Sequence, residues 1–258
     1  MKRILFLAMA LLICCGLPMD GQTRKAAGKR IAKSKTTAIA KTTPASDLSL
    51  FGLKGKVKKL VENRFIWIVT DPVYDEYGSI DSKASKPTLE PYGQRVYYFT
   101  EDGFLSGYQF IGSDGSTKRY EEIVADSKGR LAKACYDEEI EDEVVSAQLD
   151  IKRNIAEKMS SYTIFDRRDP ACIIHKGIIT LRPDGKIAKI KHNTLWDSWT
   201  QTYIYNTAGM LTKTVNKNSI DTFAITWKYE PERDANGNWF KAENSDSEVV
   251  ERQFEYYE

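Results

Sequence analysis

The chain has 258 residues, of which 41% are hydrophobic and 11% aromatic, a composition that predicts one large or two smaller globular domains and excludes a fibrous protein. Its 38 Lys and Arg outnumber its 36 Asp and Glu only because of the N-terminal part, since the chain from residue 42 onward has more acids than bases. A nucleic-acid-binding domain is therefore excluded, because such a domain concentrates cations on its folded part.

The first 21 residues have the order of a secretory signal. "MKRILFLAMALLICCG" places two cations before an apolar run that is too short to span a bilayer. The segment "LLICC" is similar to the end of a bacterial lipoprotein signal, in which Cys15, or alternatively Cys14, would be acylated. Cys14 stands where a small residue is usual, so ordinary cleavage after Gly16 or Gly21 stays open. We therefore predict a signal peptide over residues 1–21.

Residues 22–46 differ in composition from the rest of the chain. They are rich in Lys, Arg, Ala and Thr and contain no acid. This composition predicts a disordered basic tether, and its charge would favour contact with an anionic envelope surface. The remaining residues, 47–258, form the predicted folded domain.

A polar turn that ends in glycine recurs along this domain at steps of about 25 residues, with apolar or aromatic residues on both sides. In "ERDANGNWF", the carboxylate of Asp234 can accept a backbone N–H, and Gly237 can take the positive φ that a hairpin needs. The polar run is therefore interpreted as a hairpin corner and not as a ligand cradle. The recurring turn residues are Gly103, Gly129, Asn154, Gly185, Gly209, Asp234 and Gly237.

A register test supports these hairpins. A two-residue turn at Asp184 and Gly185 sets Ile179 opposite Ile190 and Leu181 opposite Ala188, and a turn at residues 102–103 sets Tyr97 opposite Tyr108. The sequence therefore predicts an all-β fold, an antiparallel meander of about six repeated hairpins in a strongly twisted or partly closed, barrel-like sheet. Residues 71–94 are predicted as a surface loop, and residues 146–162 as strand, turn and strand in preference to a helix.

Three stretches resemble the YD-repeat (Rhs-like) modules of secreted and surface proteins of Gram-negative bacteria. They are "YIYNTAG", in which Asn206 replaces the usual Asp, the opening "GLKGKVKKLVENRF" and the terminal "NGNWFKAENSDSEVVERQFEYYE". The resemblance covers residues 50–258 at the level of repeat architecture. It implies an antiparallel β meander without catalytic residues, and about six copies are too few to enclose a cargo.

Few residues suit metal or acid–base chemistry. The two histidines, His175 and His192, are expected as diagonal neighbours on one sheet face, and neither has an evident third metal ligand nearby. The six acids within residues 137–143 lack the spacing of a calcium loop, so we predict a solvated loop that the basic tether contacts. Cys135 and Cys172 leave two alternatives open, one disulfide or two separate thiols. The sequence predicts no cofactor and no metal.

Aromatic residues are the best candidates for binding. Trp196, Trp199, Tyr203 and Tyr205 would form a surface that stacks on sugar faces or on a partner protein, and the alternative is that they pack between strands. The predicted function is a non-enzymatic cell-envelope or secreted binding or assembly module with an unknown protein or glycan partner. Its location would be periplasmic, outer-membrane-associated or secreted, with membrane contact only through a lipid anchor or the tether.

The alternative function is a hydrolase that acts on envelope or extracellular polysaccharide. It would need two carboxylates about 5–10 Å apart across a cleft. The sequence does not identify such a pair.

Overall fold

The computed structural model describes residues 46–258 except 70–71, 75, 80–84, 128, 141–142, 155–158 and 195. The predicted signal peptide, with Cys15, and all but the last residue of the predicted tether lie outside the described residues. Within the described ranges, no helix is long and apolar enough to cross a membrane.

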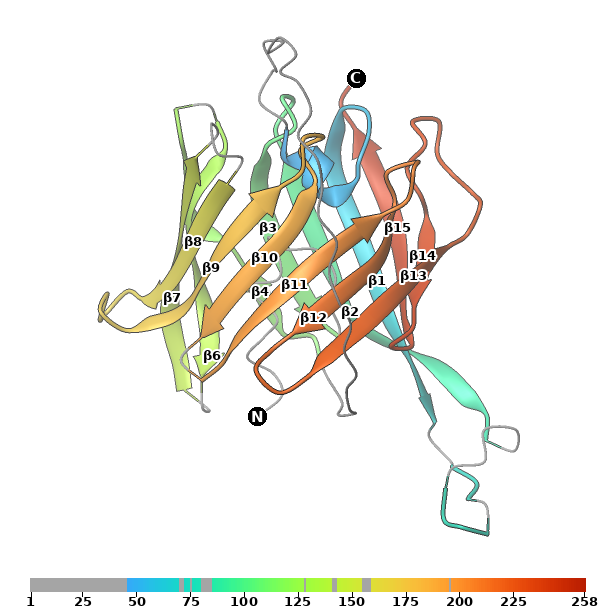
Figure 1. The fold of residues 1–258 in the computed structure, drawn as a ribbon. Helices are drawn as coiled ribbons and strands as arrows, with labels where there is room; N and C mark the ends of the chain where they lie inside the picture. Colours follow the sequence, from blue (N-terminus) through green and yellow to red (C-terminus); the bar gives the residue numbers. More distant parts are fainter. Residues whose placement is uncertain are drawn as a thin grey trace, which may run out of the picture.

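One antiparallel sheet of 15 strands makes up the fold (Figure 1). Each strand pairs with its neighbour in sequence, apart from β4 and β5, and β1 also pairs with β15, so the meander wraps around. The predicted all-β antiparallel meander is therefore confirmed. The strands are β1 (Val57–Val69), β2 (Pro87–Phe99), β3 (Leu105–Gly112), β4 (Thr117–Arg119), β5 (Glu121–Ala125), β6 (Leu131–Ile140), β7 (Glu143–Asn154), β8 (Met159–Asp166), β9 (Ile173–Leu181), β10 (Ile187–Thr194), β11 (Ser198–Tyr205), β12 (Leu211–Lys217), β13 (Thr222–Tyr229), β14 (Lys241–Asn244) and β15 (Glu248–Tyr256).

The two ends of the sheet are β4 and β5, which are separated only by Tyr120. β4 pairs with β3 and β5 pairs with β6, so the segment 117–125 changes its partner strand at Tyr120. The N–H of Tyr120 donates to the carbonyl of Tyr108 at 2.9 Å, and Glu122 has a positive φ of 47°. This segment, which we call the seam, nearly closes the sheet into a barrel.

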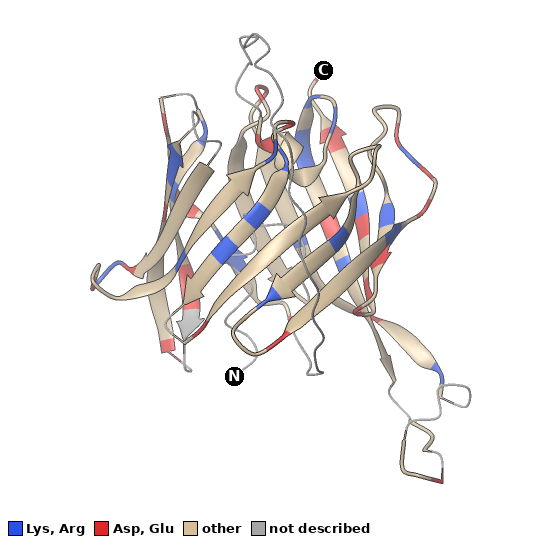
Figure 2. Ribbon diagram, in the orientation of Figure 1, with Lys and Arg blue, Asp and Glu red and all other residues tan. Residues whose placement is uncertain are grey.

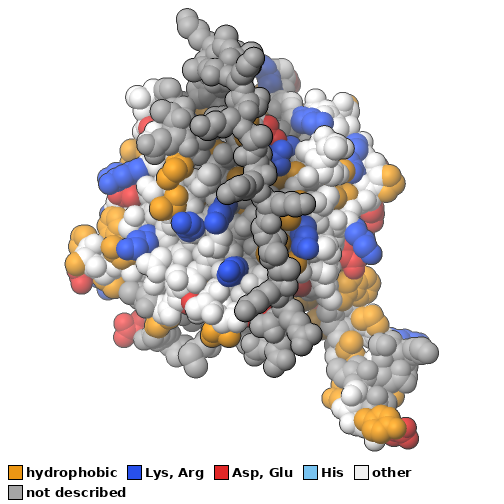
Figure 3. Space-filling view, viewed as in Figure 1, with side chains coloured by type: hydrophobic (Ala, Val, Ile, Leu, Met, Phe, Trp, Pro, Cys, Tyr) orange, Lys and Arg blue, Asp and Glu red, His pale blue; other side chains and the backbone are white. Residues whose placement is uncertain are grey.

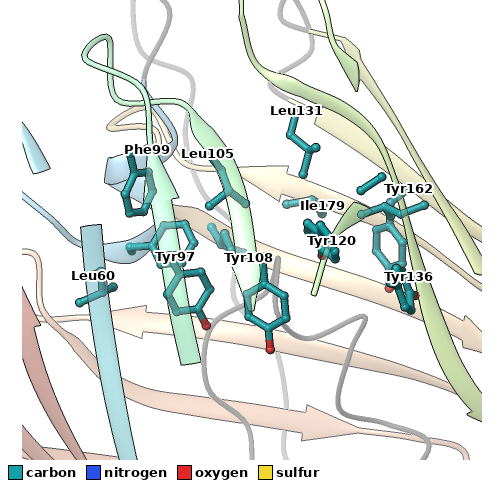
Figure 4. Packing of buried hydrophobic residues seen from close by; sticks show 14 of the residues in the cluster. Leu60, Tyr97, Phe99, Leu105, Tyr108, Tyr120, Leu131, Tyr136, Tyr162 and Ile179 are labelled. Atoms are coloured by element: carbon teal, nitrogen blue, oxygen red, sulfur yellow. The ribbon is translucent and has the colours of Figure 1, made fainter. Parts of the chain in front are cut away.

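A row of tyrosines runs across the seam inside the barrel. The ring centroids of Tyr97, Tyr108, Tyr120 and Tyr136 follow one another at 5.3, 5.2 and 5.8 Å (Figure 4). Tyr97 lies directly opposite Tyr108, as predicted. Aromatic neighbours at such distances stabilise a sheet by about 0.5–1.5 kcal/mol each, so the row offsets the sparse backbone pairing at the seam.

The predicted glycine turns share one backbone conformation. In the turn between β9 and β10, the N–H of Gly185 donates to the carbonyl of Arg182 at 3.0 Å, and the N–H of Arg182 donates to Lys186 at 2.7 Å. This pattern is a three-residue hairpin loop in which glycine takes a positive φ. The φ angles lie between 77° and 83° at Gly103, Gly129, Gly185, Gly209 and Gly237.

These five turns all lie at the same end of the barrel, because they join every second pair of strands (Figure 1). We call it the glycine-turn end. The period of about 25 residues in the sequence is therefore the length of two strands with their connections. Asn154 does not follow the pattern, since it is the last residue of β7 and pairs with Met159 instead of occupying a left-handed turn position.

Other local predictions need correction. The turn after β9 has three residues, so a bulge sets Leu181 opposite Ile187 and not opposite Ala188, although Ile179 does face Ile190. Much of the predicted loop at 71–94 belongs to β2, where Pro91 is tolerated because that part of the strand pairs with β1 alone, next to a bulge.

Two further predictions concern the middle of the chain. Residues 146–154 belong to β7 and residues 159–162 to β8, which pair antiparallel, so the two predicted strands are confirmed, and the predicted turn between them lies outside the described residues. The acidic run is not a solvated loop, because residues 137–140 belong to β6. Glu138 is buried and forms an ion pair with Lys118 at 3.6 Å.

A short 3-10 helix, η2 (Asp47–Phe51), lies across the glycine-turn end (Figure 1). The ring of Phe51 packs edge-on against Tyr97 at 4.8 Å and against Phe99 at 5.2 Å. The carboxylate of Asp47 accepts the N–H of Leu105 at 2.9 Å, and the N–H of Leu48 donates to Gly103 at 3.2 Å. This element therefore covers the barrel core at that end.

The outer surface of the barrel is polar. Side chains alternate between buried and exposed along the strands, and the exposed positions include charged residues in the middle of strands (Figure 2). A band of outward apolar residues is what a membrane-spanning barrel needs, and a Lys or Arg at its centre costs about 2–4 kcal/mol. Exposed charged side chains on the described strands include Lys191, Lys217, Lys228, Glu243 and Glu255.

The hairpin of β1 and β2 extends beyond the barrel wall (Figure 1). β15 begins at Glu248, opposite Ile66, and the N–H of Trp67 donates to the carbonyl of Ser247 at 2.9 Å, so residues 68–69 pair only with β2. Trp67, Ile68 and Val69 are more than one-third exposed. Figure 3 shows hydrophobic atoms gathered along this projection, whereas basic side chains are spread over the barrel face in that view.

Candidate functional site

A pocket of about 270 Å³ opens at the glycine-turn end. One side is formed by η2 and the residues that follow it, and the other by the turns and strand ends from β9 to β15. We call it the mouth pocket. Five of its lining side chains outside η2 are aromatic: Tyr203, Tyr205, Trp227, Tyr229 and Trp239.

The aromatic walls are held in place by contacts with their neighbours. The rings of Tyr229 and Trp239 meet edge-on at 5.2 Å, and the hydroxyl of Tyr229 donates to the carbonyl of Leu211 at 2.7 Å. The guanidinium of Arg252 lies 3.7 Å from the centroid of the Trp239 ring. Rings that are fixed in this way lose little rotamer freedom when a ligand stacks on them.

The lining includes four cations, Lys54, Lys186, Arg233 and Arg252, and no Asp or Glu. Arg252 is neutralised, because it donates twice to Glu62, at 2.9 and 2.7 Å. Lys186 donates to the carbonyl of Gly209 at 2.6 Å, and Arg233 donates to the carbonyl of Glu232 at 2.6 Å. Within the part of the chain that the structure describes, Lys54, Lys186 and Arg233 have no carboxylate partner within 4.0 Å.

The indole N–H of Trp227, a residue of the pocket lining, is closed to solvent. Trp227 is only 6% exposed, and among the described residues its Nε1 has no hydrogen-bond partner. A buried donor without an acceptor costs about 1–3 kcal/mol. Trp227 therefore contributes its ring to the pocket and not its N–H.

A chain of hydrogen bonds runs from the mouth pocket into the barrel interior. Tyr203 Oη donates to Gln201 Oε1 at 2.9 Å, and the same oxygen lies 3.1 Å from His192 Nε2. Tyr162 Oη lies 2.8 Å from His192 Nδ1 and 2.9 Å from His175 Nε2. If both histidines are neutral with the proton on Nε2, every contact in this chain pairs a donor with an acceptor.

Burial explains why the histidines stay neutral. Desolvation, with a smaller contribution from the neighbouring His192, lowers the pKa of His175 to about 3. Desolvation also lowers the pKa of His192 to about 4, although its bond to Gln201 acts in the opposite direction. Their ring centroids lie 5.4 Å apart, so the prediction that the two residues are neighbours on one sheet face is confirmed.

A cluster of charges lies beside this chain. Glu62 and Arg252 are buried partners, and Arg64 forms an ion pair with Glu248. Desolvation raises the pKa of Glu62, but the guanidinium groups of Arg252, Arg64 and Arg95 outweigh that effect and hold the pKa below its usual value. Glu62 is therefore ionised at neutral pH and keeps Arg252 in place beside Trp239.

The mouth pocket supplies stacking surfaces and positive charge. Its lining contains no carboxylate, histidine, serine or cysteine that could act as a nucleophile or a general base. In the described ranges, no group of three or more His, Cys, Asp or Glu side chains is arranged to hold a metal ion. This chemistry suits reversible binding.

The four aromatic residues predicted as a binding surface do not form one surface. Tyr203 and Tyr205 line the mouth pocket, but Trp199 faces the interior and stacks on His192 at 4.6 Å. Trp196 is 54% exposed in the turn between β10 and β11.

For Cys135 and Cys172, the sequence left open one disulfide or two separate thiols. Both are free thiols in the structure, with Cys135 buried and Cys172 partly exposed.

Several residues of the mouth pocket had no place in the predicted site. Trp227, Tyr229 and Trp239 come from the next hairpin, and Lys54 and Arg233 had no visible signal. The signal in the sequence that points to some of these pocket residues is the recurring glycine turn. Residues within a few positions of Gly209 and Gly237 gather at the glycine-turn end, and the pocket takes part of its lining from them.

Comparison with known proteins found no family model and no curated sequence that matches the chain. Among solved structures, a porin-like protein from Bacteroides uniformis ATCC 8492 is similar over 79% of this chain and 98% of its own length, at 9% sequence identity and a TM-score of 0.33. A likeness at this level carries no argument about what the chain does.

The resemblance to YD-repeat proteins is wrong. No model of such a family matches the chain. The physical reason lies in the turn, since the spacing of a polar residue and a glycine is what this type of hairpin loop requires in any β meander. The spacing reports turn geometry and is not specific to one family.

Proposed function

We propose that this chain is an exported, non-enzymatic binding module of the cell envelope, and that the mouth pocket is its ligand site. The ligand would be a small molecule, or the end of a larger one, that places a ring between the aromatic walls. The observation that carries this proposal is the pocket itself. It combines rigid aromatic side chains with a small number of polar groups at one end of a barrel, which is a common place for small-molecule sites.

The polar outer surface supports a role in an aqueous compartment. Exposed charged side chains on the strands, such as Lys191 in the middle of β10, favour water over lipid around the barrel wall. The predicted signal over residues 1–21 supports export. Together these features favour a periplasmic, envelope-attached or secreted module that meets its ligand in solution.

The test uses N-phenyl-1-naphthylamine, an uncharged aromatic dye that becomes fluorescent in apolar sites. The full chain should bind about one molecule, with energy transfer from Trp227 and Trp239, which line the pocket. Ala208 also lines the pocket and is exposed in its turn, so Ala208→Trp should fill the pocket and abolish binding. Trp196→Ala, at an exposed turn outside the pocket, should leave binding unchanged. The proposal fails if the dye does not bind, or if only Trp196→Ala weakens it.

A further inference from the structure

We propose that the mouth pocket selects anions, and that its ligand is a ring-bearing molecule with a carboxylate, sulfonate or phosphate group. This inference rests on the proposed binding function and adds the chemical class of the ligand. It is carried by the sign of the charges around the pocket, whose lining holds four cations and no Asp or Glu.

The charges around the pocket have one sign. Lys54, Lys186 and Arg233 line it, and their contacts in the described structure are to carbonyl oxygens, a sulfur atom or aromatic faces and not to carboxylates. An anion in the pocket would therefore meet cations that no carboxylate neutralises. In a partly buried site each such pair is stronger than on an open surface.

Carboxylates close to the pocket are already engaged elsewhere. Asp184 pairs with Arg182 at 3.2 Å, and Glu230 lies 3.6 Å from Lys241. Asp234 accepts the hydroxyl of Tyr256 and the N–H groups of Asn236 and Asn238, which together lower its pKa against the effect of burial. These groups are held by their own partners and do not line the pocket.

The unneutralised cations also offer strong hydrogen bonds. Lys186 and Arg233 carry N–H donors at the pocket lining, and hydrogen bonds between charged groups are roughly twice as strong as neutral ones. A neutral apolar ring would occupy the pocket but gain none of these bonds.

The experiment compares two dyes that share one ring system. 1-Anilinonaphthalene-8-sulfonate carries a sulfonate, and N-phenyl-1-naphthylamine is the same molecule without it. The sulfonate dye should bind the full chain at least about tenfold more tightly, a difference that a few charge-assisted contacts can supply. Raising NaCl from about 20 mM to about 500 mM should weaken the sulfonate dye and leave the uncharged dye unchanged.

Variants that remove a charge from the pocket lining show which residues cause the preference for the sulfonate dye. Lys186→Gln combined with Arg233→Gln should weaken the sulfonate dye about tenfold and the uncharged dye less than about twofold. Lys228→Gln is the matched control, because Lys228 is exposed on β13 beside Trp227 but does not line the pocket. Near-UV circular dichroism confirms that each variant is folded.

The outcomes separate the two proposals. Equal affinity for both dyes would overturn anion selection and leave the binding function standing. Binding of neither dye would remove the binding function, and the inference with it. Sulfonate binding that survives Ala208→Trp unchanged would assign the dye to another surface, such as the exposed tip of β1 and β2, and would also overturn the inference.

Discussion

Gly103 and Gly129 hold equivalent positions in the repeated turn, with φ angles of 79° and 78°. Their surroundings differ. A Cβ at Gly103 would lie 2.8 Å from Leu48 Cδ1, whereas a Cβ at Gly129 would meet no atom of another described residue within 4 Å, its chain neighbours apart. The first glycine therefore serves both the turn and the packing of η2, and the second serves the turn alone.

This pair allows the two roles to be measured separately. Gly129→Ala should lower the free energy of unfolding by about 1–2 kcal/mol, the cost of a positive φ for a residue with a Cβ. Gly103→Ala should cost about 1–3 kcal/mol more, because Leu48 and η2 must shift. Urea unfolding of both variants checks this. Equal losses would show that η2 does not press on the turn.

The buried histidines predict a specific dependence of stability on pH. In the unfolded chain their pKa is the ordinary value of 6.5, whereas in the folded chain it is lowered to about 3 for His175 and about 4 for His192. Between these values the unfolded chain binds more protons than the folded chain. Stability is therefore complete above about pH 6.5 and falls as the pH falls toward 4, by up to about 1.4 kcal/mol per pH unit for each histidine.

Urea unfolding at several pH values between about 7.5 and about 5 tests this sign. Other groups also titrate. Burial, for example, raises the pKa of Asp47, which acts in the opposite direction at lower pH. The informative quantity is therefore the difference between the natural chain and His175→Gln, which should lose stability less steeply on acidification. Identical slopes would mean that His175 is not buried in its neutral form.

At the scale of elements, η2 is the part that joins the barrel core to the mouth pocket. Phe51 is 4% exposed and contacts Tyr97 and Phe99 on one side, and it also lines the pocket. Its carbonyl accepts Arg252 Nη1 at 3.3 Å. The helix therefore fixes one wall of the pocket through contacts with the core.

Phe51→Ala should lower the free energy of unfolding by about 3–5 kcal/mol, as expected for a large aromatic removed from a core. Leu50→Ala is the control, because Leu50 also lines the pocket but is only half-buried, and it should cost about 1–2 kcal/mol. Thermal unfolding followed by circular dichroism compares the two. If Leu50→Ala costs as much as Phe51→Ala, η2 is held by its pocket side and not by the core.

The elements differ in how far the sequence can predict them. The hairpins were predictable, because glycine turns and alternating apolar residues are local signals, and Ile179 opposite Ile190 followed from the turn alone. The start of β2 at Pro87 was not, because proline suggests a loop unless one knows that the strand lacks a second neighbour there. η2 has too few residues for any periodicity, and its position depends on the closed barrel.

At the scale of the whole molecule, the candidate site depends on contacts that no local pattern contains. The pairing of β1 with β15 brings Glu62 beside Arg252, which lie far apart in the chain. The mouth pocket collects residues from η2 and from strand ends between β9 and β15. Sequence reasoning could find Tyr203 and Tyr205 as candidates, but only the closure of the sheet shows which rings share a cavity and which, such as Trp196, do not.

The same closure predicts where the barrel opens most easily. β4 has three residues, and all five residues of β5 are exposed. β5 pairs with β6 through only three registered positions, interrupted by two shifts. By contrast, β8 and β9 pair along most of their length. Local opening follows sparse pairing and exposure, so the seam should be the least stable part of the wall.

Hydrogen exchange measured by mass spectrometry tests this expectation. Amides of residues 117–125 should exchange at least about tenfold faster than those of β9 to β11. β14 is the control, because it has only four residues but pairs with β13 on one side and β15 on the other. If β14 is protected while the seam is not, missing neighbours and not strand length cause the difference. Protection of the seam equal to that of β9 would mean that the tyrosine row alone is sufficient to close the barrel.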